Sequence, residues 1–107
     1  MDFTTACDIR YACESAFFTI HEIKIAMTAD LGTFPRIVKL LPEGIVRELA
    51  YTGRPLPAEE ALSLGFVNKV FPDQESMLEA VMKIAGDIAS NAPLAVYGCK
   101  KMINLRT

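Results

Sequence analysis

The sequence predicts an α/β fold in which two or three short strands are followed by a mainly helical region. Two observations lead to this prediction. Residues 7–20 contain two short stretches with strand character, and residues 33–105 carry apolar side chains at helical spacing, interrupted by one brief strand. The chain has 107 residues, which is the length of one domain at most.

Two short strands are expected near the beginning of the chain. Residues 7–12 alternate in character, with Cys7, Ile9 and Tyr11 on one side, as in a strand. Residues 16–20, Ala-Phe-Phe-Thr-Ile, are apolar and rich in aromatic and β-branched types. They predict a second strand that is buried on both faces.

Two helices are expected next, with almost no loop between them. The first covers Thr33–Leu41, where Pro35 is tolerable because it falls in the first turn. Its apolar face repeats at the i, i+3, i+4, i+7 spacing of a helix: Phe34, Ile37, Val38 and Leu41. The second covers Pro42–Thr52 and ends at Gly53, the residue type that favours the left-handed conformation after a helix.

The remaining sequence predicts three more helices and one strand. Pro57–Gly65 forms a short helix with proline and acids at its start and glycine at its end. Phe66–Phe71 returns as a brief strand. Asp73 is a suitable N-cap for a long helix that ends near Asn91, and Leu94–Leu105 completes the chain as an amphipathic helix.

Composition and charge limit the classes of partner. The net charge is −2 with both signs interspersed, which argues against a nucleic-acid interface. No apolar run approaches the roughly 20 residues that span a bilayer, so no membrane partner is expected. Hydrophobic residues make up 51% of the chain, which is high for so small a domain. They fit either a tight core or, as we favour, a face that packs against another part of a protein or a neighbouring subunit.

The three cysteines, Cys7, Cys13 and Cys99, show neither C-x-x-C spacing nor a histidine cluster. Both a disulfide framework and a metal site are therefore disfavoured. Buried thiols in a reducing compartment are the expected alternative.

Acidic residues are the candidates for chemistry. Asp30 directly precedes a predicted helix, where acids commonly serve the helix dipole, and Glu22 lies just past a strand, where acids are commonly solvated. Two carboxylates that flank one substrate can instead move a proton from carbon to carbon. His21 and Glu22 are adjacent in an extended segment, so their side chains point to opposite faces and a catalytic pair is not expected.

Residues 1–36, MDFTTACDIRYACESAFFTIHEIKIAMTADLGTFPR, resemble the crotonase (enoyl-CoA hydratase/isomerase) superfamily, and RELAYTGRPLPAEEALSLGFVNKVFPD continues the resemblance. The branch most similar is that of the Δ3,5-Δ2,4-dienoyl-CoA isomerases. Those enzymes have Ala-Ala-Asp-Val-Gly-Thr where this chain has Thr-Ala-Asp-Leu-Gly-Thr at residues 28–33, whereas most hydratases have glycine in place of Asp30. The resemblance implies the C-terminal portion of a crotonase (ClpP/crotonase-like) fold.

The resemblance also implies the roles of three acids. In an isomerase of fatty-acid β-oxidation, Asp30 would remove a proton from C2 of a 3,5-dienoyl-CoA and Glu22 would deliver one to C6. Asp2 matches the other acid of the hydratase pair, so an enoyl-CoA hydratase that uses Asp2 and Glu22 is the alternative. A non-catalytic oligomerisation remnant is a third reading, in keeping with the apolar composition.

Further expectations follow from the same resemblance. The substrate is an acyl-CoA thioester, no separate cofactor is needed because coenzyme A is part of the substrate, and the protein is a homo-oligomer, a trimer or hexamer. Residues 1–72 belong to the crotonase core, and residues 73–107 form a helical region for oligomerisation and closure of the acyl-CoA site. Lys100 and Lys101 could meet coenzyme A phosphates, although a solvated helix face is the simpler reading.

The resemblance leaves out the family's first half, which supplies backbone N–H donors for the thioester oxygen. The sequence therefore leads us to expect a truncated piece that is catalytically silent by itself. No targeting address is visible. The family implies the cytoplasm for a bacterial source and the mitochondrion or peroxisome for a eukaryotic one.

Overall fold

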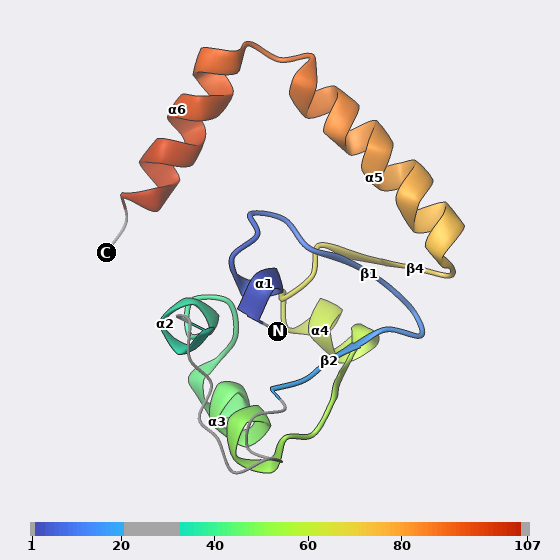
Figure 1. Cartoon of the computed structure of the whole chain (residues 1–107), viewed down its shortest axis with the longest axis vertical. Coiled ribbons are helices and arrows are strands. Elements are labelled where there is room, and N and C mark those ends of the chain that lie inside the picture. The colour runs from blue at the N-terminus through green and yellow to red at the C-terminus, as the bar shows by residue number, and fades with distance from the viewer. Residues whose placement is uncertain (1, 21–32, 106–107) are drawn as a thin grey trace. The chain divides into compact units, whose positions relative to one another are not determined.

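The computed structural model describes residues 2–20 and 33–105 (Figure 1). The chain divides into two compact units, Met1–Met77 and Leu78–Thr107. The elements are α1 (Asp2–Thr5), β1 (Tyr11–Cys13), β2 (Phe17–Phe18), α2 (Thr33–Ile37), α3 (Glu43–Thr52), β3 (Leu56–Pro57), α4 (Ala58–Ser63), β4 (Lys69–Phe71), α5 (Gln74–Ala89) and α6 (Pro93–Asn104). Apart from α1 and β3, which were not predicted, they follow the expected order of two short strands and then helices interrupted by one strand. The predicted α/β class is confirmed.

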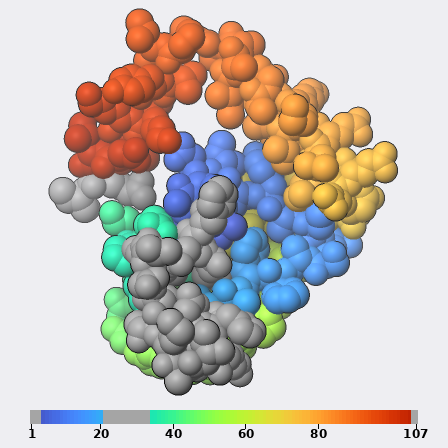
Figure 2. Space-filling model, in the orientation of Figure 1, coloured from blue at the N-terminus to red at the C-terminus, as the bar shows by residue number. Residues whose placement is uncertain are grey.

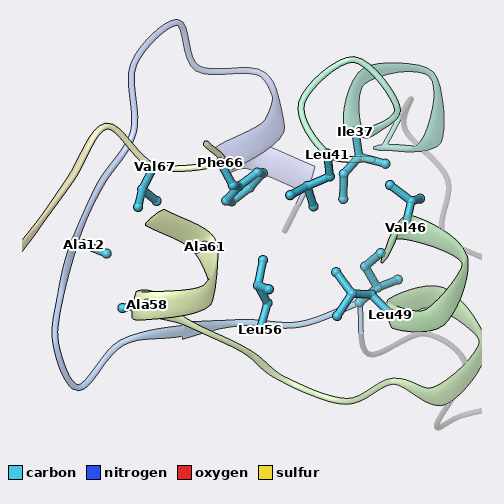
Figure 3. Close-up of a cluster of buried hydrophobic side chains, with 11 residues drawn as sticks. Ala12, Ile37, Leu41, Val46, Leu49, Leu56, Ala58, Ala61, Phe66 and Val67 are labelled. Atoms are coloured by element: carbon cyan, nitrogen blue, oxygen red, sulfur yellow. The ribbon is translucent and has the colours of Figure 1, made fainter. Parts of the chain in front are cut away.

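The hydrophobic core lies in the first unit and draws side chains from nearly all of its elements. Figure 3 shows Ile37, Leu41, Val46 and Leu49 of the α2–α3 region facing Leu56 and Phe66. The ring of Phe18 packs edge-on against that of Phe66, with centroids 5.0 Å apart. Burial of these large apolar side chains supplies the main stabilisation of the unit.

Two pairs of short strands frame this core. β1 and β4 are parallel, with Ala12 opposite Val70 in register. β2 and β3 are antiparallel, with Phe18 opposite Leu56. Each pair joins segments that are about 40 or more residues apart in the sequence, so the strands depend on long-range contacts.

The first predicted strand begins later than expected. Residues 7–9 form a bend instead, and Ile9 is 41% exposed, so the predicted apolar face of Cys7, Ile9 and Tyr11 is wrong. The reason lies in Arg10, whose guanidinium donates hydrogen bonds of 2.7 Å to the carbonyls of Cys7 and Phe66. These bonds hold the chain in a bend, and the ladder starts only at Tyr11.

The second predicted strand is shorter than expected, and it is not buried on both faces. Only Phe17–Phe18 pair with a neighbour, and Phe17 is 63% exposed. Their partner β3 is only two residues long, so it covers little of the segment. Within residues 16–20, Ile20 is buried in the core, and Ala16 and Phe18 pack against it partly buried.

The helices of the first unit mostly confirm the prediction. α3 ends at Gly53 with φ 67°, and its N–H donates to the carbonyl of Leu49, as expected of a left-handed cap. α4 is followed by Gly65 with φ 81°. α2 is shorter than predicted, because after Ile37 the chain tightens into turns in which the N–H groups of Leu40 and Leu41 share the Ile37 carbonyl.

The predicted strand at residues 66–71 begins only at Lys69. Phe66 and Val67 are buried, but their N–H groups bond to the Ala61 carbonyl at the end of α4. They therefore belong to a turn that follows the helix. The Asn68 N–H donates a 2.7 Å hydrogen bond to the carbonyl of Arg10, and the pairing with β1 begins at the next residue.

The two C-terminal helices match the predicted ones. The carboxylate of Asp73 accepts a 2.7 Å hydrogen bond from the Ser76 N–H, which is the N-cap that the sequence predicts for α5. No residue of α5 or α6, both described in full, is buried, and their side chains are visible over the length of both helices (Figure 2). Cys99 on α6 is exposed and Cys7 and Cys13 are half-buried, so the prediction of buried thiols is wrong.

None of the described helices is long and apolar enough to cross a membrane. The proposed role of residues 73–107 in oligomerisation and site closure stays a prediction.

Candidate functional site

Of the three predicted catalytic acids, only Asp2 belongs to the described residues. Asp30, Glu22 and the neighbouring His21 lie outside the described residues. For Asp2 the structure describes the backbone, as the first residue of α1. The catalytic roles of Asp30, Glu22 and Asp2 stay predictions.

One described boundary of residues 21–32 is Ile20, whose side chain is buried in the core. The preceding residue, Thr19, donates its hydroxyl hydrogen to the backbone carbonyl of Gly53, at 3.2 Å. The chain that leads to Glu22 is thus attached both by apolar packing and by a hydrogen bond. Because a hydrogen bond prefers a narrow range of distances and angles, this bond restrains both the position and the direction of the chain at Thr19.

The acceptor, the Gly53 carbonyl, lies in a turn that is held by ion pairs. Next to Gly53, the guanidinium of Arg54 lies 2.6 Å from a carboxylate oxygen of Glu48 and 3.0 Å from one of Glu60. Hydrogen bonds to Glu60 and Glu48 raise the pKa of Arg54, so its charge is permanent. Arg54 therefore ties the end of α3 to α4 and holds the turn whose carbonyl Thr19 uses.

The other described boundary is α2, which begins at Thr33 and buries Ile37 completely. From this helix Arg36 reaches α1, where its Nε lies 3.0 Å from the Thr5 hydroxyl. Thr5 is only 5% exposed. The helix that begins with Asp2 is therefore packed against the helix that follows Asp30 in the chain.

Arg10 also contacts α1. Its guanidinium donates to the Thr4 carbonyl at 3.5 Å as well as to those of Cys7 and Phe66, and it lies 5.1 Å above the Phe66 ring. Burial lowers the pKa of Arg10, but a guanidinium remains charged. Arg10 thus joins the end of α1 to the core.

A shallow pocket of about 270 Å³ lies between α2 and α3. Most of its surface is apolar, and polar atoms come from the row of Glu43, Arg47 and Tyr51, in which Arg47 bonds to both neighbours. The pocket can admit an apolar group. The lining consists of Phe34, Val38, Glu43, Val46, Arg47, Ala50 and Tyr51.

Lys100 and Lys101 lie on α6, and both are exposed. The ammonium of Lys101 is 5.8 Å from the centre of the Tyr97 ring. A second hollow of about 290 Å³ includes both lysines and Tyr97. Contact of either lysine with coenzyme A stays a prediction.

Within residues 2–20 and 33–105, no group of three or more histidine, cysteine or acidic side chains is gathered as a metal would require.

The hydrogen bonds that hold the segments next to the predicted acids were not predicted from the sequence. The bonds Thr19–Gly53, Arg36–Thr5 and Arg10–Phe66 connect residues 34, 31 and 56 positions apart. Neither periodicity nor local motifs carry a signal for such contacts, because both describe neighbours along the chain.

Residues 1–107 match the family described as enoyl-CoA hydratase/isomerase. Among curated relatives, the mitochondrial Delta(3,5)-Delta(2,4)-dienoyl-CoA isomerase of Homo sapiens is 45% identical over 94% of this chain. The peroxisomal enzyme of the same name from Arabidopsis thaliana is 43% identical over 96%. The carnitinyl-CoA dehydratase of Salmonella typhi is 38% identical over 91%. The chain spans 31% of the human relative and 37% of each of the other two.

Solved structures give the same picture of the fold. An enoyl-CoA hydratase from Mycobacterium tuberculosis matches with a TM-score of 0.86 and 38% identity over 94% of this chain and 39% of its own. A putative enoyl-CoA hydratase/isomerase from Mycobacterium abscessus matches with a TM-score of 0.90 and 31% identity, over 95% of this chain and 42% of its own. The predicted resemblance and fold are confirmed.

Proposed function

The chain belongs to the enoyl-CoA hydratase/isomerase family, and on that basis we propose that the protein carrying this sequence converts a 3,5-dienoyl-CoA to its 2,4-isomer. One observation carries the proposal. Asp30 stands in the Thr-Ala-Asp-Leu-Gly-Thr stretch that resembles the dienoyl-CoA isomerases. Support comes from the relatives of that name, which are 43–45% identical to the chain.

In the proposed mechanism, the carboxylate of Asp30 removes a proton from C2. The electron pair left behind is delocalised over the thioester and the diene, and Glu22 delivers a proton to C6, which leaves double bonds at C2 and C4. One proton leaves and one is gained, so no cofactor is consumed. Positioned acid and base groups of this kind contribute ~10²–10⁴-fold to a rate.

Support also comes from the described residues on either side of the segment that carries Glu22 and Asp30. Ile20 precedes Glu22 by two residues and is buried, and α2 begins three residues after Asp30 and buries Ile37. Both attachment points thus belong to one core. Catalytic groups need such fixed supports, because small displacements of a reacting group lower the rate strongly.

The remaining features follow from the same proposal. The substrate is an acyl-CoA thioester, coenzyme A enters as part of it, and the assembly is a homo-oligomer, a trimer or hexamer. The protein acts in the cytoplasm of a bacterium or in the mitochondrion or peroxisome of a eukaryote. The relatives from human and Arabidopsis, which are named mitochondrial and peroxisomal, support the eukaryotic alternatives.

A second candidate function is hydration of a 2-enoyl-CoA by a water held between Asp2 and Glu22. It is favoured by the solved structure named enoyl-CoA hydratase, at 38% identity, and by the carnitinyl-CoA dehydratase relative. In this mechanism Asp30 has no part in the reaction.

A side-by-side assay of the whole protein that carries this sequence tests the two candidates. Isomerisation is followed by formation of the conjugated 2,4-dienoyl-CoA, and hydration by loss of the 2-enoyl-CoA. We expect isomerisation to be the faster reaction. Equal or faster hydration would contradict the proposal and favour the second candidate.

A further inference from the structure

A hydrogen bond joins two segments that adjoin the predicted acids. The Nε of Arg36, in α2, lies 3.0 Å from the Oγ1 of Thr5, in α1. Thr5 is the buried polar residue of the described core, at 5% exposure. Because the guanidinium is charged and the hydroxyl is removed from water, this bond is stronger than one between neutral groups on the surface.

α1 cannot hold its own position. It is four residues long, and a single turn of helix is not stable by itself. Its place therefore depends on contacts with other elements, of which Arg36 provides one to the side chain of its last residue. Asp2 begins the same turn, about 4.5 Å along the helix axis from Thr5.

α2 provides a firm base for this contact. Ile37, next to Arg36, is completely buried, and Leu41 just beyond it is buried as well. The same helix begins three residues after Asp30. The bond to Thr5 thus connects the turn that carries Asp2 to the helix whose first turn follows Asp30.

We propose that Arg36 is a positioning residue: its bond to Thr5 fixes the start of α2, which follows Asp30 in the chain, against α1, and this attachment serves the isomerisation that uses Asp30. The inference rests on the proposed function, in that the acids of this family fragment are taken to act on an acyl-CoA. It adds two residues that sequence motifs do not single out. Neither residue is assigned a contact with substrate.

The test uses the whole protein that carries this sequence. Thr5→Val removes the hydroxyl at nearly the same shape, and Arg36→Met removes the donor. Thr5→Ser keeps the hydroxyl and is the rescue variant. Lys39→Met is the matched control, because Lys39 is an exposed cation three residues beyond Arg36. Circular dichroism and urea unfolding establish that each variant is folded, and Thr5→Val, which changes no charge, carries the test if Arg36→Met does not fold.

We expect kcat to fall about tenfold to hundredfold in Thr5→Val and Arg36→Met with KM changed less than threefold, because a displacement of about 1 Å caused by a change away from the chemistry can cost about hundredfold in rate. Thr5→Ser and Lys39→Met should stay within about twofold of the parent. The loss in the double variant should be smaller than the sum of the two single losses, because both changes remove the same shared bond.

Other outcomes separate the two proposals. A parent that isomerises its substrate while both single variants keep its kcat would overturn the role of Arg36 and leave the proposed function standing. Additive losses in the double variant would overturn it too. A parent that hydrates but does not isomerise would contradict the proposed function, and the same variants then test the positioning role on hydration. A parent with neither activity would overturn both proposals.

Discussion

The Thr19 hydroxyl lies 3.2 Å from the backbone carbonyl of Gly53 and donates a hydrogen bond to it. Gly53 is buried and adopts the left-handed conformation that ends α3. A stretch that leads to Glu22 is thus fastened to the end of a helix 34 residues away. The bond gives the short β2 segment a fixed exit direction that its two ladder residues could not supply.

Thr19→Val should therefore lower kcat of the whole protein by about tenfold, because removal of the hydroxyl frees the direction of the chain before Glu22. The free energy of unfolding should fall by about 1 kcal/mol, the typical value of one hydrogen bond. Steady-state kinetics and urea unfolding measure both effects. Thr19→Ser keeps the donor and should behave like the parent; an equally slow Thr19→Ser would contradict this reading.

Asp30→Asn in the whole protein should reduce isomerisation by ~10²–10⁴-fold, because an amide keeps the shape of the carboxylate but cannot accept a proton. Glu22→Gln should reduce the same reaction. The matched control is His21→Gln. It should change turnover little, because adjacent side chains in an extended segment are expected to point to opposite faces, which keeps His21 away from the substrate side of Glu22. Parental turnover in Asp30→Asn would rule out the isomerase assignment.

Asp73 should make the stability of α5 depend on pH. Hydrogen bonds from the backbone N–H and the hydroxyl of Ser76 hold the pKa of Asp73 below its ordinary value of 3.8. Because the pKa is depressed in the folded state, the stabilisation is complete above pH 3.8 and is lost as the pH falls through the lower, folded value.

The matched variant is Asp73→Asn, which can still cap the helix but does not titrate. Urea unfolding at pH 7 and at pH 3, with helical ellipticity as the signal, should show a larger difference for the parent than for Asp73→Asn. An identical pH dependence in the two proteins would show that Asp73 does not contribute in this way.

Leu49→Ala should destabilise the first unit by about 2–5 kcal/mol, because Leu49 is completely buried in the core and its truncation leaves a cavity. Leu62→Ala removes the same atoms from a side chain that is 38% exposed, and it should lose markedly less. Urea unfolding of both variants gives the comparison. Equal losses would contradict the complete burial of Leu49 in the core.

The chain should self-associate, because α5 and α6 expose large apolar side chains along their length, among them Leu94 at 85% and Met102 at 70%. Sedimentation velocity should show species larger than the monomer. Leu94→Glu combined with Met102→Glu should shift the distribution towards the monomer, whereas Lys83→Glu on α5 should not. A compact monomer at all concentrations would contradict the prediction.

All the described helices except the single turn α1 could be predicted from the sequence, because their signals are local. In α3 the apolar residues Val46 and Leu49 recur at helical spacing and Gly53 supplies the stop, so position and buried face are both confirmed. Asp73 likewise marks the start of α5, because its carboxylate caps the N–H of Ser76, only three residues further along the chain. A helix satisfies its backbone hydrogen bonds within itself, so a short window of sequence contains the information.

The strands could be predicted only in part, since each needs a partner from elsewhere in the chain. β3 was not predicted at all, because Leu56–Pro57 become a strand only through pairing with Phe17–Phe18. The early bend at residues 7–9 depends on Arg10 reaching the Phe66 carbonyl, a contact across 56 residues. Such pairings are decided by the packed structure, where the partner is present.

The family and the three candidate acids came from the sequence by itself, because the order of residues around Asp30 and Glu22 is a local pattern that resembles one family. The supports of the site were decided by the tertiary structure. Thr19 with Gly53 and Arg36 with Thr5 are brought together only when α1, α2 and α3 pack on one core. Hydrogen bonds between distant residues depend on distances of a few ångströms in the folded chain, and no spacing along the sequence encodes them.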